Sequence, residues 1–254
     1  MDLALQGRRA LVTGASKGIG FAVARTLADE GCAVHLVART ATDLEAAAAA
    51  IETATGSMPT WAALDLADSA NVDALAAAHA DTDILVNNAG AIPAGSLEAV
   101  DEARWRSAWD LKVFGYINLC RHFYASMRAR GRGVIVNVIG AGGEKPTAAY
   151  AAGAGGNAAL MALTRALGAR STLDGIRVVG INPGLIETAR LVTMQRAMAA
   201  EKLGDPERWR ELLDYEFPPG QPEHIADMVA FLASDRSAFT TGTIVTVDGG
   251  LCAR

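Results

Sequence analysis

The chain has 254 residues, of which 51% are hydrophobic and 20% are charged, and this balance is typical of a globular protein rather than a disordered one. Its formal net charge of -5 at pH 7 argues against nucleic acid or an acidic membrane surface as the main partner, so we expect a small-molecule ligand. Three widely spaced cysteines argue against a disulfide framework and a metal site, and the chain shows neither a basic leader nor a long apolar run. We therefore expect a cytoplasmic protein with no membrane span.

Seven short apolar segments are spaced along the chain and predict β-strands. In order they read RALVTG, AVHLVA, TWAALD, DILVNN, GVIVNV, IRVVGIN and GTIVTVDGG. Most are apolar on both faces, as expected for a parallel sheet covered by helices on each side. Helical patterns lie at residues 21–29, 43–53, 69–80, 102–127 and 157–172. This alternation predicts a single α/β domain over residues 1–254, built on a doubly wound, Rossmann-type sheet.

A glycine-rich turn, LVTGASKGIG, follows the first strand. Gly14 allows a tight turn, Gly18 lets a pyrophosphate approach the backbone at the start of the next helix, and Gly20 allows close packing of helix and strand. We expect a dinucleotide to bind here. The cofactor-binding residues expected in this turn are Gly14, Ser16, Lys17, Gly18, Ile19 and Gly20.

The end of the second strand, HLVART, bears on the choice of cofactor. An acidic residue at this place would bind the adenosine ribose and repel a 2′-phosphate. Ala38 occupies the place instead, Arg39 follows it, and Lys17 lies in the glycine turn. Two cations without a carboxylate favour NADP(H), with NAD as the alternative.

Four motifs in order resemble the short-chain dehydrogenase/reductase family over nearly the whole chain. They are TGASKGIG at residues 13–20, NNAG at 87–90, INPGLIET at 181–188 and the terminal TVDGG. The resemblance implies a seven-stranded parallel sheet, a nicotinamide cofactor across the carboxyl ends of the strands, and a homo-oligomer, a tetramer or a dimer. It also implies further cofactor contacts, which are Asp65 and Leu66 at the adenine, Asn87, Ala89 and Gly90 at the ribose, and Pro183, Gly184 and Thr188 at the nicotinamide.

The family's catalytic residues are missing from the register that this resemblance sets. The family uses a serine after the fifth strand, a tyrosine thirteen positions later, a lysine four beyond that, and an asparagine on the preceding helix. The run NAALMALTRALG puts Asn157 at the lysine position, which puts Gly153 at the tyrosine and Gly140 at the serine. Asp110 stands where the asparagine is usual.

Tyr150 is the candidate replacement for the missing tyrosine. It lies nearly one helical turn before position 153, so its phenol could lean toward the same pocket and donate a hydrogen bond. The alternative is a tyrosine that only packs at the mouth of the pocket. Asp110 is a candidate base if it is buried beside the cofactor, and otherwise caps its own helix. Lys145, in a nearby loop, is either recruited to the site or solvated.

The tetrapeptide GAGG occurs at residues 140–143 and 153–156, where catalytic side chains would project. A glycine inside a helix costs roughly 0.5–1 kcal/mol relative to alanine, so these glycines need a reason. Our hypothesis is that they open space beside the nicotinamide and expose backbone N–H groups, which together with Asn157 polarise the substrate.

Residues 189–219 interrupt the alternation with a charged, partly helical segment. Long connections at the carboxyl ends of strands tend to cover ligands, so we predict a lid, with a hairpin that packs on a neighbouring subunit as the alternative. Its apolar residues, which would suit an apolar or mixed ligand, are Leu191, Met194, Met198, Trp209 and Phe217.

The cofactor motifs favour an NADP(H)-dependent oxidoreductase that acts on a carbonyl or an alcohol with an altered catalytic site. Two alternatives stay open because the proton-transfer residues are missing. One is a non-redox enzyme on the same scaffold, and the other is a catalytically silent cofactor-binding subunit.

Overall fold

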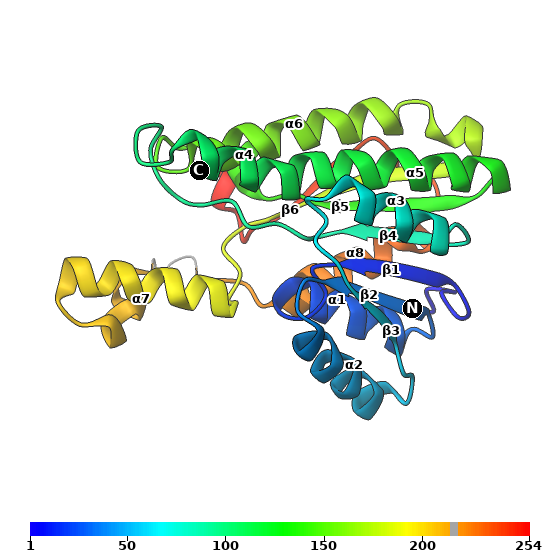
Figure 1. Cartoon of the computed structure of the whole chain (residues 1–254), viewed down its shortest axis with the longest axis horizontal. Coiled ribbons are helices and arrows are strands. Elements are labelled where there is room, and N and C mark those ends of the chain that lie inside the picture. The colour runs from blue at the N-terminus through cyan, green and yellow to red at the C-terminus, as the bar shows by residue number, and fades with distance from the viewer. Residues whose placement is uncertain (214–217) are drawn as a thin grey trace.

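The seven predicted strands form one parallel sheet in the computed structural model, which describes residues 1–213 and 218–254 (Figure 1). Their order across the sheet is β3-β2-β1-β4-β5-β6-β7. The order reverses between β1 and β4, and doubly wound sheets bind ligands beside such a switch point. The predicted fold class is confirmed. The strands are β1 (Arg9–Thr13), β2 (Ala33–Ala38), β3 (Thr60–Ala63), β4 (Ile84–Asn87), β5 (Gly133–Val138), β6 (Ile176–Pro183) and β7 (Ile244–Val247).

Helices cover both faces of the sheet (Figure 1). The α-helices of the described residues are α1 (Gly18–Asp29), α2 (Ala41–Thr55), α3 (Ser69–Ala78), α4 (Glu102–Trp109), α5 (Gly115–Arg130), α6 (Ala151–Gly168), α7 (Ala189–Leu203) and α8 (Pro222–Ala233). Helices α1, α2 and α8 pack on one face, and α3 and α5 pack on the other. Helix α6 lies beside α5 on that second face (Figure 1).

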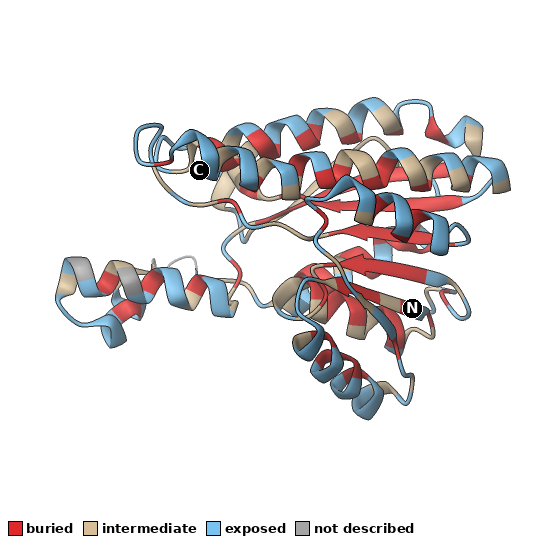
Figure 2. Ribbon diagram, in the orientation of Figure 1, coloured by how far each residue is buried: buried red, intermediate tan, exposed pale blue. Residues whose placement is uncertain are grey.

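The hydrophobic core has a layer on each face of the sheet, and Figure 2 shows the central strands buried between them, whereas β3 is mostly exposed and β7 is partly exposed. Neighbouring residues of β1 illustrate the alternation, because Val12 belongs to the layer of α1 and α8 whereas Leu11 belongs to the layer of α3 and α5. Both side chains are fully buried. Strands buried on both faces explain the continuous apolar runs in the sequence.

The helix predicted over residues 102–127 is interrupted. Helix α4 ends at Trp109, a single π-helical turn η1 covers Asp110–Phe114, and α5 begins at Gly115. Such turns widen a helix locally and occur frequently at functional sites. Helix α6 also differs from the prediction, because it begins at Ala151 and therefore contains the second GAGG run.

Helix α7 and the short 3-10 helix η4 (Pro206–Leu212) form an arm that projects from the body of the protein (Figure 1). An ion pair of 3.0 Å between Arg196 and Glu207 joins the two helices, and Trp209 is buried in the arm. The predicted lid is thus a helical hairpin. Its residues 214–217, among them Phe217, lie outside the described residues.

All three cysteines lie in the described ranges and are free thiols. Within those ranges, no helix has the length and apolar character needed to cross a membrane. The same residues include no group of three or more His, Cys, Asp or Glu side chains arranged to hold a metal ion.

Candidate functional site

The turn after β1 adopts a geometry that favours glycine. Gly14 and Gly18 have φ angles of 65° and 60°. A Cβ atom on Gly20 would overlap the Gly14 carbonyl, so helix α1 packs directly against the turn. Lys17, the N-cap of α1, makes no side-chain hydrogen bond to the first turn of the helix. The backbone N–H groups of that turn are therefore suited to an anion such as pyrophosphate.

The NNAG motif at the end of β4 braces this turn. Asn88, for which the sequence raised no expectation, donates to the carbonyls of Thr13 and Gly14 at 3.0 and 3.3 Å. Asn87 is fully buried, and its amide donates to Asn137 Oδ1 at 2.9 Å. This burial contradicts the expected contact of Asn87 with a ribose, because none of its surface is open to a ligand.

A cavity of about 630 Å³ brings Arg39 and Asp65 together with Arg104 and Arg190. Three guanidinium groups against one carboxylate suit the phosphates of a dinucleotide. Lys17 is exposed and pairs with Asp43 at 3.4 Å instead.

Two more of the expected cofactor residues differ in exposure. Leu66 is buried and its side chain packs in the core layer of α3 and α5, and its expected contact with the adenine stays a prediction. Ala89 packs against the same layer but is only partly buried.

The segment after β6 passes over the glycine turn. A Cβ atom on Gly18 would lie 3.3 Å from Thr188 Cγ2. Thr188 also caps α7, since its Oγ1 accepts from the backbone N–H of Leu191 at 3.3 Å. Pro183 ends β6 and is buried, and Gly184 donates its N–H to Val247 at 3.0 Å. The nicotinamide-end residues therefore lie at the same edge of the sheet as the turn.

Polar side chains from η1, α5 and α6 bind consecutive carbonyl groups at the end of β5. The bonds run from Tyr116 Oη to Val138, from Lys112 Nζ to Ile139 and from Asn157 Nδ2 to Gly140, at 2.9, 2.5 and 3.3 Å. The N–H of Gly140 donates to Asn182 Oδ1 at 3.4 Å. The chain at the expected serine position is therefore fixed from several sides.

The aromatic ring of Tyr150 fills the space beside Gly153. A Cβ atom on Gly153 would overlap Cζ and Cε1 of this ring, and one on Gly142 would lie 3.1 Å from its Cδ1. Gly153 is buried and Tyr150 is partly exposed. The phenol thus occupies the volume into which a side chain at position 153 would extend.

The indole of Trp109 packs against Gly155 and Gly156 of α6. A Cβ atom on Gly156 would lie 3.4 Å from Trp109 Nε1 and 3.1 Å from Val113. The same Nε1 donates to the carbonyl of Ala152 at 3.0 Å. The second GAGG run thus makes room for two aromatic rings.

This arrangement contradicts the open space that the hypothesis expects beside the glycines, because aromatic rings fill it. The N–H groups of Gly143 and Ala154 donate to the carbonyls of Gly140 and Tyr150, at 3.3 and 2.8 Å. Asn157 is buried against Gly140, so it holds the chain there rather than facing a ligand.

Comparison with known proteins identifies the family. Residues 14–252 match the family model described as enoyl-(acyl carrier protein) reductase. The chain is a short-chain dehydrogenase/reductase. This membership makes it an oxidoreductase, as the resemblance implied.

Relatives of this short-chain dehydrogenase/reductase cover its whole length. It is 36% identical to the 2-keto-3-deoxy-L-fuconate dehydrogenase of Xanthomonas campestris pv. campestris, over 97% of this chain and 80% of the relative. It is also 36% identical to the cis-4-hydroxycyclohexanecarboxylate dehydrogenase of Sinomonas cyclohexanicum, over all of both chains. The crystal structure of L-sorbose reductase from Gluconobacter frateurii, complexed with NADPH and L-sorbose, matches with a TM-score of 0.92 and 32% identity over all of both chains.

One cation, Arg190, acts on both the Tyr150 phenol and Lys112 in this short-chain dehydrogenase/reductase. Arg190, in the first turn of α7, donates to the carbonyls of Gly90, at 3.2 Å, and Ile92. Burial raises the pKa of Tyr150, and the charge of Arg190 opposes that rise. Burial, and then the charge of Arg190, lower the pKa of Lys112 to about 8. The only indication of Lys112 in the sequence is its position, two residues after the candidate base Asp110.

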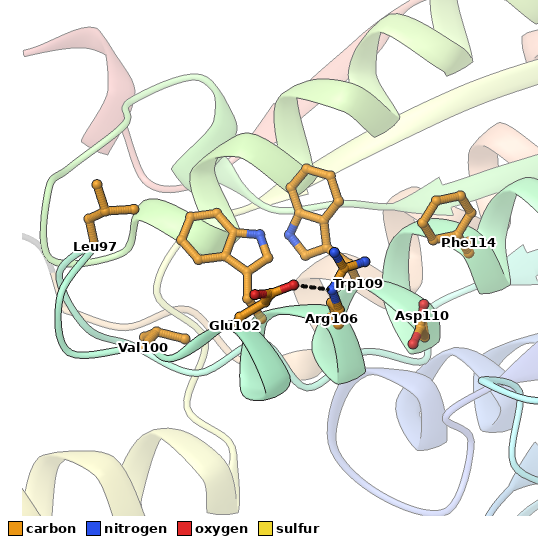
Figure 3. Close-up of a pocket in the computed structure, with 8 residues that line it drawn as sticks. Leu97, Val100, Glu102, Arg106, Trp109, Asp110 and Phe114 are labelled. Carbon is orange, nitrogen blue, oxygen red and sulfur yellow. Dashed lines mark hydrogen bonds and ion pairs between the residues drawn. The ribbon is translucent and has the colours of Figure 1, made fainter.

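Asp110 and Lys145 take no part in this arrangement. Asp110 is exposed and lines a groove on α4 that also holds Trp109, Phe114 and the ion pair of Glu102 and Arg106 (Figure 3). The burial on which its expected role as a base depended is therefore absent. Lys145 Nζ donates to the carbonyls of Leu251 and Arg254, at 2.9 and 2.8 Å, and so is engaged with the C-terminal segment.

Proposed function

We propose that this chain is an NADP(H)-dependent enzyme that interconverts a ketone and a secondary alcohol, with Tyr150 as the proton donor and acceptor. The observation that carries this proposal is the overlap of the Tyr150 ring with the side-chain space of Gly153. Position 153 is where the family resemblance places the catalytic tyrosine. In this chain the Tyr150 ring lies where the side chain of residue 153 would begin, against the Cα of Gly153.

The residues at the cofactor edge fit NADP(H). The uncapped first turn of α1 suits a pyrophosphate. Arg39, with Ala38 in place of an acidic residue, suits a 2′-phosphate. Ser16, Ile19, Gly90 and Thr188 have partly exposed surface at this edge and would contact the cofactor. Related structures with 32% and 27% identity, L-sorbose reductase and the actinorhodin polyketide ketoreductase, were solved with NADPH.

The proposed chemistry divides the work between cofactor and chain. NADPH, when bound, would supply a hydride to the carbonyl carbon. Tyr150 donates its proton to the carbonyl oxygen, which gives the alcohol, and takes a proton back in the reverse direction. Burial raises its pKa, so the phenol holds its proton at neutral pH and is a weaker acid than a solvated phenol. Asn157 is a positioning residue that holds the carbonyl of Gly140.

The names of the relatives support a polar substrate that carries a hydroxyl or keto group. These relatives are described as acting on a keto-deoxy sugar acid and on a hydroxycyclohexanecarboxylate, and one structure contains L-sorbose. We propose that the arm of α7 and η4 closes over such a substrate, since α7 begins at the cofactor edge.

Assembly and location are further parts of the proposal. A groove of about 540 Å³ on α4 is lined by apolar side chains, among them Leu97, Trp105 and Phe114, and by the charged Glu102, Arg106 and Asp110. Strand β7 is an edge strand of the sheet. Two copies meeting at such apolar and edge surfaces would form a dimer, and four would form a homotetramer. The free thiols support a reducing, cytoplasmic location.

The experiment is NADPH oxidation followed by absorbance, with a panel of ketoses, keto acids and cyclic ketones, in the natural protein and in Tyr150→Phe. We expect the substitution to lower kcat about 10²–10⁴-fold, the usual contribution of a general acid, and to leave NADPH affinity unchanged. Tyr124→Phe is the matched control. Tyr124 lies on α5, and its hydroxyl donates to Asp174 at 2.7 Å. Full activity in Tyr150→Phe would refute the proposal.

A further inference from the structure

The Lys112 side chain reaches the inside of the site from the π-helical turn η1. Its ammonium donates to the Ile139 carbonyl at 2.5 Å. Its stem crosses Gly90, because a Cβ atom on Gly90 would lie 2.8 Å from Lys112 Cδ and 3.2 Å from Cγ. Gly90 belongs to the NNAG motif at the cofactor edge. The lysine therefore lies between the end of β5 and the expected path of the cofactor.

The donors of Lys112 are only partly used. An ammonium has three N–H donors, and among the residues that the structure describes only the Ile139 carbonyl accepts from this one. Lys112 also forms no ion pair with a carboxylate in those ranges. A cation placed inside a protein without an acidic partner is costly unless a ligand joins it.

Arg190 on α7 is the charge that acts on Lys112, and it lowers the lysine pKa further. Tyr116 on α5 is the titratable group that binds next to it, at the Val138 carbonyl, and burial raises the pKa of this phenol. Tyr150, before α6, lies in the field of the same arginine. Asp110, on the lysine's own turn, is exposed. The local balance is positive, which suits an anionic cofactor.

Lys112 and Asn157 donate hydrogen bonds to neighbouring backbone carbonyls. They bind the carbonyls of Ile139 and Gly140, which are consecutive in the chain. A lysine at position 157 would begin from the same place on α6 as the Asn157 amide. The two positions thus converge on the end of β5 from different helices.

We propose that Lys112 supplies the cation that position 157 lacks, and that in its protonated form it holds the nicotinamide half of the bound cofactor beside Gly90. This inference rests on the proposed NADP(H)-dependent function. It differs from a structural role, because a lysine that only fastens Ile139 to η1 would not couple its proton to cofactor binding.

Proton linkage gives the test. If bound NADPH favours the charged lysine, binding raises the lysine pKa, and NADPH affinity must fall as pH rises through the value of about 8 in the free protein. We expect the Kd, measured by nicotinamide fluorescence, to increase about five- to tenfold between pH 7 and pH 9. A Kd that stays constant over this range would overturn the inference.

Two variants separate charge from structure. Lys112→Gln keeps a donor for Ile139 and removes the charge, so we expect its Kd at pH 7 to be about tenfold weaker and independent of pH. Lys112→Arg keeps the charge above pH 9, so we expect nearly natural affinity at pH 7 and no rise at pH 9. If Lys112→Gln does not fold, Lys112→Arg alone decides. A rise that persists in either variant would overturn the inference.

Lys202→Met is the control, and NADPH binding at pH 7 separates the proposed function from the role of Lys112. Lys202→Met, at the exposed end of α7, should keep the natural pH profile. If the natural protein does not bind NADPH at pH 7, the proposed function itself fails. If it binds and only the pH dependence is absent, the function stands and the role of Lys112 falls.

Discussion

Glycines have opposite structural roles in two segments of this molecule. In the turn after β1, the missing side chains of Gly14 and Gly20 let backbone and the Asn88 amide come together, and the outer surface is left to a ligand. At the start of α6, the space beside Gly153 and Gly156 is filled by aromatic rings of the chain itself. The function of a glycine-rich motif therefore depends on which atoms fill the space that side chains would otherwise take.

The largest effect is expected from Gly20→Ala in the first segment. The new Cβ atom would overlap the Gly14 carbonyl and meet Asn88 Nδ2, so α1 must move away from β1. Overpacking of this kind costs about 1–3 kcal/mol and would displace the pyrophosphate site. We expect at least a roughly tenfold loss of NADPH affinity in fluorescence titration. Unchanged affinity would show that the turn does not hold the cofactor.

Gly153→Ala is the corresponding change in the second segment, and we expect a smaller effect. Its Cβ atom would overlap the Tyr150 ring, which can move where backbone cannot. We expect activity to fall about 10–100-fold through displacement of the phenol, with NADPH affinity kept. Equal losses of affinity and turnover would contradict the separation of the two segments.

Gly155→Ala is the matched control, with the smallest effect. Gly155 is exposed, and a Cβ atom there would lie 3.5 Å from Trp109, an ordinary contact. Replacing a helical glycine by alanine should stabilise the protein by about 0.5–1 kcal/mol, which thermal unfolding can measure. Activity should not change. A loss of stability would indicate that the first turns of α6 are more crowded than these distances imply.

The strands and the cofactor edge could be predicted from the sequence because their signals are local. Apolar runs of strand length and the glycines after β1 depend on residues close in the chain, and both are found where expected. Arg39 and Asp65 line one cavity, and their contacts with a cofactor stay a prediction.

The rest depended on the direction of individual side chains. Asn87 and Asn88 are neighbours, but Asn87, the last residue of β4, turns into the core, whereas Asn88 turns to the glycine turn. The π-helical turn likewise leaves Asp110 exposed and brings Lys112 to Ile139. Periodicity does not reveal such a turn, so the sequence predicts a role for Asp110 and none for Lys112. The packing of the Tyr150 ring against Gly153 depends on the side-chain conformation, which the sequence does not show.

The central claim is that the phenol of Tyr150 stands in for a tyrosine at position 153. Its most direct test is kcat/KM for the double variant Tyr150→Ala, Gly153→Tyr, compared with Tyr150→Ala alone. Because removal of the first ring frees the volume for the second, we expect the double variant to recover at least about tenfold of the lost activity. No recovery, in a protein that folds and binds NADPH, would contradict the claim.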